Sequence, residues 1–388
     1  MPRWPHLPFP LALVLLSLAV GLAAGLDGPA LLAAFGAGFG RQQGYFALVL
    51  LPSFFLAAAL TRGEALGLGR LGVALSPFAG AGMVCPDTAY AALAPVTAGH
   101  RRAVAVGSYA GFKLLLPAGP LLIGVALSAD VASPGFALLG LALLLPVGAA
   151  GLLWLRLAGA AEPPAPAAPP ARVAPGAGLR RLLPLAFLGT LLLAGLAGRP
   201  SHPALALLTS PVGALLATSL ATGALLPPEH RRECLDSSLR RTAPLLLTLG
   251  AASALGAMLA EALPLRAWAS RLASGQTSLL LLLLLFAVAA TFKVVNGSSM
   301  ATFAAVPPVL APVLAASSLD RTFATYAICL GSFVAILPND SFFWLTQPSE
   351  AEGPRRGADF TFAGASLLQG LLGIALLSGA LLLGGRLR

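Results

Sequence analysis

Long apolar segments recur along nearly the whole chain of 388 residues, from Leu11 to Leu383, with only short polar stretches between them. Runs such as Leu279–Phe286 do not alternate with polar residues, so they do not suit the strands of a membrane barrel. A hydrophobic fraction of 57%, with 10% charged residues, is too apolar for a water-soluble fold. The sequence predicts an all-α polytopic membrane protein with about ten to twelve apolar segments, because helices satisfy their own backbone in lipid.

The net charge of +10 comes from arginines scattered over the polar stretches, and no soluble basic domain carries them. We therefore expect no nucleic-acid partner and attribute the arginines to the positive-inside rule. The densest basic pairs, expected in the cytoplasm of a bacterial inner-membrane protein, are Arg180-Arg181, Arg231-Arg232 and Arg240-Arg241. The N-terminal apolar run to Leu26 is expected to be an uncleaved first span, with a signal peptide as the alternative.

One segment, Ala160–Gly178, is rich in alanine and proline and predicts an extended linker, because proline is excluded from helix interiors. It divides residues 1–159 from residues 179–388, which we expect to form an N-terminal and a C-terminal transmembrane repeat. Each half contains two helix-terminating interruptions in the same order: Cys85–Thr88 and Leu116–Pro120, then Asn296–Ser299 and Pro338–Ser341. This order favours two inverted repeats with discontinuous helices and re-entrant hairpins. The alternative is a chance echo, since glycine and proline are frequent throughout.

The chain has only two lysines, Lys113 and Lys293, against 22 arginines, and both lie deep in apolar segments just before an interruption. Cations are costly in hydrocarbon and tend to mark a substrate pathway or a ligand site. The spacing predicts that both lysines bind an anion near unwound helix ends. The interruption that follows Lys113, Leu116 to Pro120, offers backbone groups only, at Pro117 and Gly119.

The interruption at Pro338 is the most specific of the four. Proline ends a helix, and Asn339, Asp340 and Ser341 suit the N-cap of a short helix that follows. The start of such a helix attracts anions, and an ionisable Asp inside a span indicates function, so we interpret Asp340 as a proton carrier. The alternative is that Asn339 or Asp340 only caps the helix.

The patch of Asn296, Gly297, Ser298 and Ser299 offers small polar groups to the oxygens of a substrate, and its alternative role is helix packing. Asp87 is the second candidate proton carrier, with helix capping as its alternative. Glu64 and Glu261 end apolar spans and are expected to be interfacial charges, with a proton carrier as the alternative.

Three elements resemble the gluconate permeases, which are proton-coupled carriers of gluconate and related organic acids within a larger ion-transporter superfamily. Gly331-Ser332 followed by Asn339-Asp340-Ser341-Phe342-Phe343-Trp344-Leu345 is similar to their Gly-Ser…Asn-Asp-Ser-Gly-Phe-Trp element. Phe292–Ala301 resembles their Arg-x-Ala-x-Gly-Ser-Ala-Thr-Val-Ala element, with Lys293 in place of the arginine. Leu116–Pro120 looks like a reduced form of their Pro-Pro-His-Pro-Gly-Pro element. The chain is shorter than typical members, and Phe342 stands where the family has glycine.

These observations predict a secondary transporter, with symport of a proton and a small organic anion such as a sugar acid or hydroxycarboxylate. Alternatives are an anion channel, or a sodium-coupled carboxylate transporter of a related branch. The sequence leaves open whether the chain forms a homo-oligomer. No ATP-binding Gly-Lys-[Ser/Thr] motif, nucleophile–base pair or metal-ligand cluster is visible, so we expect neither an enzyme nor a cofactor.

Overall fold

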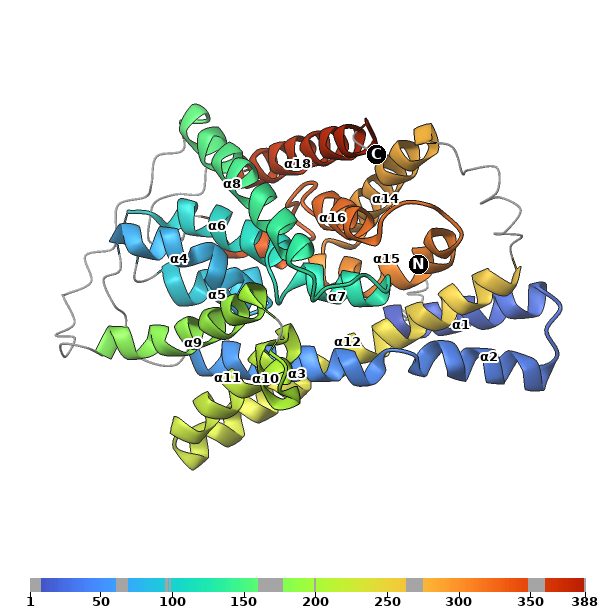
Figure 1. Ribbon diagram of the computed structural model, residues 1–388, viewed down its shortest axis with the longest axis horizontal. Coiled ribbons are helices and arrows are strands. Elements are labelled where there is room, and N and C mark those ends of the chain that lie inside the picture. Colours follow the sequence, from blue (N-terminus) through green and yellow to red (C-terminus); the bar gives the residue numbers. More distant parts are fainter. Residues whose placement is uncertain are drawn as a thin grey trace, which may run out of the picture.

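The computed structural model describes residues 8–60, 69–94, 97, 99–159, 177–198, 200–262, 275–347 and 360–386 (Figure 1), and the secondary-structure elements within these ranges are helices. Glu64 lies outside these ranges. Before the gap at residue 160 lie α1 (Phe9–Ala23), α2 (Gly28–Gly40), α3 (Gln43–Leu60), α4 (Gly69–Gly82), α5 (Pro86–Leu93), α6 (Arg101–Leu114), α7 (Gly119–Ala126) and α8 (Pro134–Leu157). After it lie α9 (Ala177–Ala197), α10 (Pro203–Thr209), α11 (Pro211–Leu225), α12 (Pro228–Ala262), α14 (Gly275–Asn296), α15 (Ser299–Ala315), α16 (Arg321–Gly331), α17 (Ser341–Leu345) and α18 (Thr361–Arg386).

Among the described residues, six helical stretches are long and apolar enough to cross a membrane, or seven if the bent pair α10–α11 counts as one span. The axes of that pair differ by 83°, and Ser210 between them caps α11 through a bond from the Gly213 amide. Apolar helices of 10–17 residues, including α1 and α15, are also present in the described part of the chain and are too short to count as spans. The all-α polytopic class is therefore confirmed. The spans are fewer than the predicted apolar segments because several of those segments are fragments of broken helices.

The four interruptions predicted from the sequence are breaks between helices: α4–α5, α6–α7, α14–α15 and α16–α17. Each second helix starts with a residue type that favours a helix N-terminus. Pro86 starts α5, and Pro120 is the second residue of α7. Ser298 caps α15 and Asp340 caps α17 through their side chains. The predicted linker falls mostly outside the described residues, and α9 begins at Ala177, within its last residues.

Corresponding helices pack against each other around these breaks in the two halves. In the first, α4 packs along α6, and in the second, α14 packs along α16. Glycine allows the close approach in both: a Cβ at Gly111 would collide with the backbone of Pro77, and one at Gly331 with the carbonyl of Phe286. Helices α8 and α18, which follow the broken helices, lie side by side (Figure 1). The division into repeats at residues 159 and 179 stays a prediction.

The long helix α12 packs against helices from both halves of the chain. It packs against α1, α2, α3 and α15, so it contacts both the N-terminal helices and one broken helix of the second half. Helices α7 and α15 also touch, as do α7 and α16. These contacts bring the breaks of the two halves into one polar region in the core.

Candidate functional site

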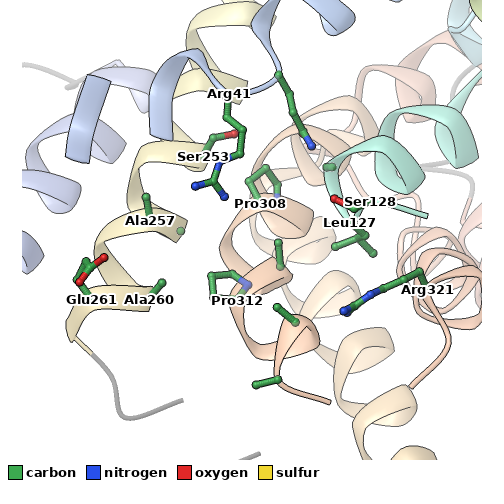
Figure 2. A pocket seen from close by; sticks show the side chains of 16 residues that line it. Arg41, Leu127, Ser128, Ser253, Ala257, Ala260, Glu261, Pro308, Pro312 and Arg321 are labelled. Atoms are coloured by element: carbon green, nitrogen blue, oxygen red, sulfur yellow. The ribbon is translucent and has the colours of Figure 1, made fainter. Parts of the chain in front are cut away.

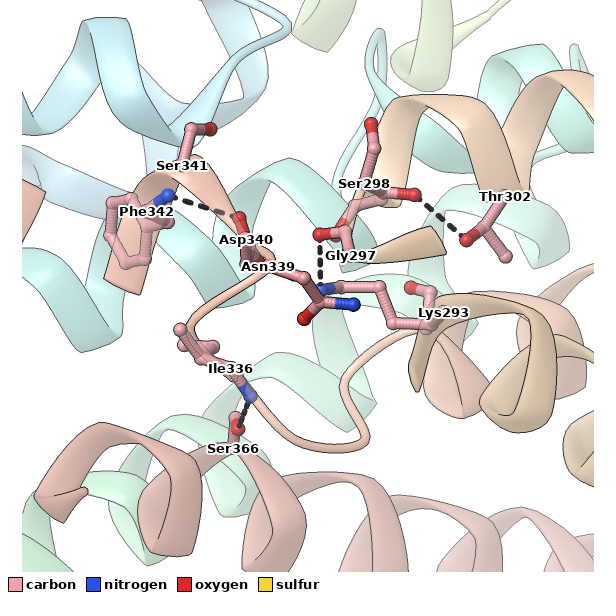
Figure 3. Close-up of polar contacts among 12 residues, drawn as sticks. Lys293, Gly297, Ser298, Thr302, Ile336, Asn339, Asp340, Ser341, Phe342 and Ser366 are labelled. Atoms are coloured by element: carbon pink, nitrogen blue, oxygen red, sulfur yellow. Dashed lines mark hydrogen bonds and ion pairs between the residues drawn. The ribbon is translucent and has the colours of Figure 1, made fainter. Parts of the chain in front are cut away.

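A buried ion pair lies at the centre of this region. The Lys293 ammonium lies 2.5 Å from Oδ2 of Asp340, and it also donates to the Gly297 carbonyl at 2.7 Å (Figure 3). Lys293 is fully buried and only 7% of the Asp340 side chain is exposed. A buried charge requires a partner, and these two neutralise each other. The candidate anion-binding lysine and the candidate proton carrier therefore contact each other directly.

The Asp340 carboxylate has a second structural role. Its Oδ1 accepts the Phe342 amide at 3.0 Å and so caps α17. The carboxylate thus divides its two oxygens between a helix N-terminus and a lysine. The capping role that the sequence offered for Asp340 is therefore present, together with the ion pair, and its role as a proton carrier stays a prediction.

Asn339 and Gly297 join the α14–α15 break to the α16–α17 break. The Asn339 amide donates to the carbonyls of Val294 at 2.8 Å and Val295 at 3.2 Å, which belong to the last turn of α14. Gly297 has a φ of +79°, and a Cβ there would collide with the Asn339 carbonyl. Only glycine combines this backbone conformation with so close an approach.

Lys113 reaches from the first half into both breaks of the second. Its ammonium donates to Ser299 Oγ at 2.9 Å, at the start of α15. It also donates to Ser332 at the end of α16, to the Oγ at 3.0 Å and to the carbonyl. The ring of Tyr109, one turn earlier on α6, lies 4.1 Å from the ammonium and gives a cation–π contact. Among the described residues, Lys113 has no carboxylate in ion-pair contact, unlike Lys293.

Asp87 marks the edge of the site. Its carboxylate accepts a 2.5 Å hydrogen bond from the Ser341 hydroxyl, so α5 of the first half meets α17 of the second. Both residues line an open pocket of about 650 Å³, together with Thr88 and Arg241. The Arg241 guanidinium donates to Thr88 at 3.1 Å. We call this the Asp87 pocket; it leads from outside the protein to the α17 end of the site.

The remaining predicted residues occupy structural positions. Ser298 Oγ accepts the Ala301 amide at 3.1 Å, and Asn296 is the last residue of α14. Gly119 starts α7, buried against the ring of Phe303, and Pro117 lies in the break before it. Of the first-half candidates, only Lys113 and Asp87 contact the second half through the polar bonds above. Substrate contact for these residues stays a prediction.

Three residues that belong to this region were not among the sequence candidates. Tyr109 precedes Lys113 by four residues, a helical spacing that could have signalled a shared face. Ser332 lies within the Gly-Ser element of the family resemblance. Arg241 was interpreted only as a positive loop charge, and its contact with Thr88 crosses 153 residues, beyond the reach of any local pattern.

Comparisons with known proteins bear on both halves. The profile of the GntP family permease matches residues 192–349, a segment that contains Lys293, Asn339 and Asp340. The structure of the YdaH transporter of Alcanivorax borkumensis, reported to have an unusual topology, is similar over 97% of each chain, with a TM-score of 0.63 at 19% identity. At that identity, the likeness shows the fold. Comparison with curated protein sequences gives no match.

The apolar helices define a multi-pass membrane protein, and the fold together with the matched segment supports a secondary transporter. Over residues 192–349 the chain is similar to the GntP family permeases, and the resemblance to gluconate permeases is confirmed there as that of a divergent relative. Lys113 and Asp87 lie outside the matched segment.

Proposed function

We propose that this protein is a symporter that carries a small organic anion, such as a sugar acid or hydroxycarboxylate, together with a proton across a bacterial inner membrane. The observation that carries the proposal is the buried pair of Lys293 and Asp340, held between two helix breaks at 2.5 Å. Such a pair links proton binding to anion binding without any further element.

The coupling follows from charge balance. While Asp340 is ionised, its carboxylate occupies the Lys293 ammonium, and no second carboxylate can take that place. Protonation of Asp340 neutralises it and leaves Lys293 as an unpaired buried cation, which is strongly unfavourable. An incoming carboxylate restores the balance, so proton and anion bind together. Loss of the proton reforms the internal pair and expels the anion.

The groups around the pair suit a hydroxylated anion. In this structure the side chains of Asn339 and Ser298 bond to backbone groups at the end of α14 and the start of α15. Gly297 lacks a side chain, so a ligand can approach the backbone closely there. Asn296, Ser299 and Ser341 add polar groups at the ends of α14, α15 and α17. These groups are proposed to exchange part of their internal bonds for bonds to the oxygens of the substrate.

Asp87 is proposed to pass the proton between Asp340 and the Asp87 pocket. It lines that pocket and accepts the bond from Ser341, the residue next to Asp340. The two carboxylates then have separate roles, because Asp87 meets water and Asp340 meets Lys293.

The test is uptake of labelled gluconate and a panel of small hydroxy acids into proteoliposomes with an imposed inward proton gradient. We expect accumulation above the external concentration, abolished by a protonophore. The matched control is the Asp340→Asn, Lys293→Ala double variant, which should accumulate nothing. Uptake by the double variant equal to that of the unaltered protein would contradict the proposal. Uptake that only equilibrates would favour a channel, and uptake driven by sodium alone would favour the sodium-coupled alternative.

A further inference from the structure

A second pocket, of about 830 Å³, opens among the ends of α12, α15 and α7, the start of α16 and the link between α2 and α3 (Figure 2). Its polar lining residues are Arg41, Gln42, Ser128, Ser253, Glu261 and Arg321. We call it the α12–α15 pocket. None of these residues belongs to the site around Lys293.

The two arginines enter the pocket from different elements. Arg41 lies at the end of α2 and Arg321 starts α16, and Figure 2 shows both side chains directed into the space beside α15. Within the part of the chain that the structure describes, neither has an ion-pair partner, and one terminal nitrogen of Arg321 is buried without a hydrogen-bond partner. A buried polar group without a partner is costly, so this nitrogen favours a ligand.

The chemistry of the lining indicates which ligand. Two guanidinium groups and one carboxylate, that of Glu261, leave an excess of positive charge. Guanidinium forks bind carboxylates in a bidentate manner. Ser128, Ser253 and Gln42 supply hydroxyl and amide groups next to them. The combination suits a carboxylate that also carries hydroxyl groups.

The pocket is remote from the Lys293 site. Helix α15 starts at Ser299 beside that site and reaches the pocket only with Pro308, Ala311, Pro312 and Ala315. Pro308 lies nine residues after Ser299, which corresponds to about 13 Å of helix. Helix α12 likewise carries Arg241 of the Asp87 pocket in its first half and Ser253 and Glu261 of this pocket in its second half. Along α12 the two pockets are therefore separated by the twelve residues from Arg241 to Ser253, about 18 Å of helix.

We infer that the α12–α15 pocket is a second anion site, which holds the carboxylate of a hydroxylated organic anion at the mouth opposite the Asp87 pocket. The identity of the anion rests on the proposed function; the presence of an anion site rests on the two arginines. The pairs Arg231-Arg232 and Arg240-Arg241, expected in the cytoplasm, lie towards the start of α12, so this mouth is the outer one, where substrate enters.

The experiment measures gluconate binding by calorimetry on the purified full chain in detergent, in the Lys293→Ala, Asp340→Asn background that removes the central site. We expect gluconate to bind this background and glucose, its uncharged analogue, not to bind. Adding Arg321→Gln should weaken gluconate binding at least tenfold, and adding Arg41→Gln should also weaken it. Arg321→Lys keeps the charge without the fork and should give an intermediate loss. The matched control is Arg156→Gln, which changes an exposed arginine at the end of α8 and should change nothing.

The outcomes separate this inference from the proposed function. Absence of binding of gluconate, acetate and phosphate to the background variant overturns the second site. Binding that persists unchanged in Arg321→Gln also overturns it, provided that thermal melting shows the variant to be folded. If the unaltered protein accumulates no organic anion in proteoliposomes while the background binds one through Arg321, the symport proposal fails and the anion site stands.

Discussion

The Ser341 hydroxyl donates a 2.5 Å hydrogen bond to the Asp87 carboxylate, across 254 residues of sequence. Ser341 is adjacent to Asp340, so this one bond places the pocket-lining carboxylate of the first half beside the lysine-paired carboxylate of the second. The two carboxylates are thereby linked through Ser341, although each lies in a different half of the chain.

The first prediction concerns that path. Asp87→Asn removes the only ionisable group of the Asp87–Ser341 contact while preserving its size. We expect gradient-driven accumulation to fall at least tenfold, because Asp340 loses its connection to water. Exchange of labelled for unlabelled anion at equal pH requires no net proton movement and should persist. Loss of both activities together would assign Asp87 a structural role.

The second prediction separates structure from function in the ion pair. Asp340→Ala leaves Lys293 buried and unpaired and should destabilise the protein by about 3–5 kcal/mol. The charge-neutral combination of Lys293→Met with Asp340→Asn should recover most of that stability and still fail to transport. Thermal melting in detergent and uptake in proteoliposomes are the two readouts. Melting temperatures that are equal in both variants would show that the charges are not coupled.

The third prediction tests the backbone at Gly297. Gly297→Ala forces a side chain into a left-handed conformation and against the Asn339 carbonyl. We expect a loss of about 1–3 kcal/mol of stability and the loss of uptake. Gly148→Ala, in the middle of α8 with nothing within 4 Å of its Cβ position, is the control and should be neutral or stabilising. Normal transport by Gly297→Ala would show that the close contact between the α14–α15 break and the α16–α17 break is not needed for transport.

The fourth prediction distinguishes the bonds of Lys113. Ser332→Ala removes one hydroxyl and leaves the carbonyl acceptor, so it should cost only about 1 kcal/mol. Lys113→Met removes every bond to Ser299 and Ser332 at once and should lower uptake more than tenfold. The melting temperature of each variant shows how much of the effect is structural. If the two substitutions lowered uptake equally, the bond from Lys113 to the Ser332 hydroxyl would account for the whole effect of Lys113.

Local residue chemistry was sufficient to predict the helix breaks. Proline, glycine and short polar residues interrupt helices wherever they gather, so each of the four interruptions was visible without tertiary information. The rarity of lysine identified Lys113 and Lys293 for a related reason: arginine serves as the general cation of this chain. Asp340 followed from its place after Pro338.

The partners of these residues depended on tertiary packing. Nothing near Lys293 in the sequence indicates that a carboxylate 47 positions later would neutralise it, or that Lys113 would bond to serines 186 and 219 positions away. The α12–α15 pocket was missed because Arg41 and Arg321 are isolated in the sequence and resemble ordinary loop charges. The bent pair α10–α11 was missed because its residues are apolar on both sides of the bend.

Helix α12 has 35 residues, which corresponds to about 52 Å, well beyond the roughly 30 Å of a hydrocarbon core. Arg241 and Glu261 are 20 residues apart on this helix, about 30 Å, which is close to the thickness of that core. Helix α12 forms part of the wall of both pockets, with Pro244 between them. A movement of this one helix would therefore alter both openings at once.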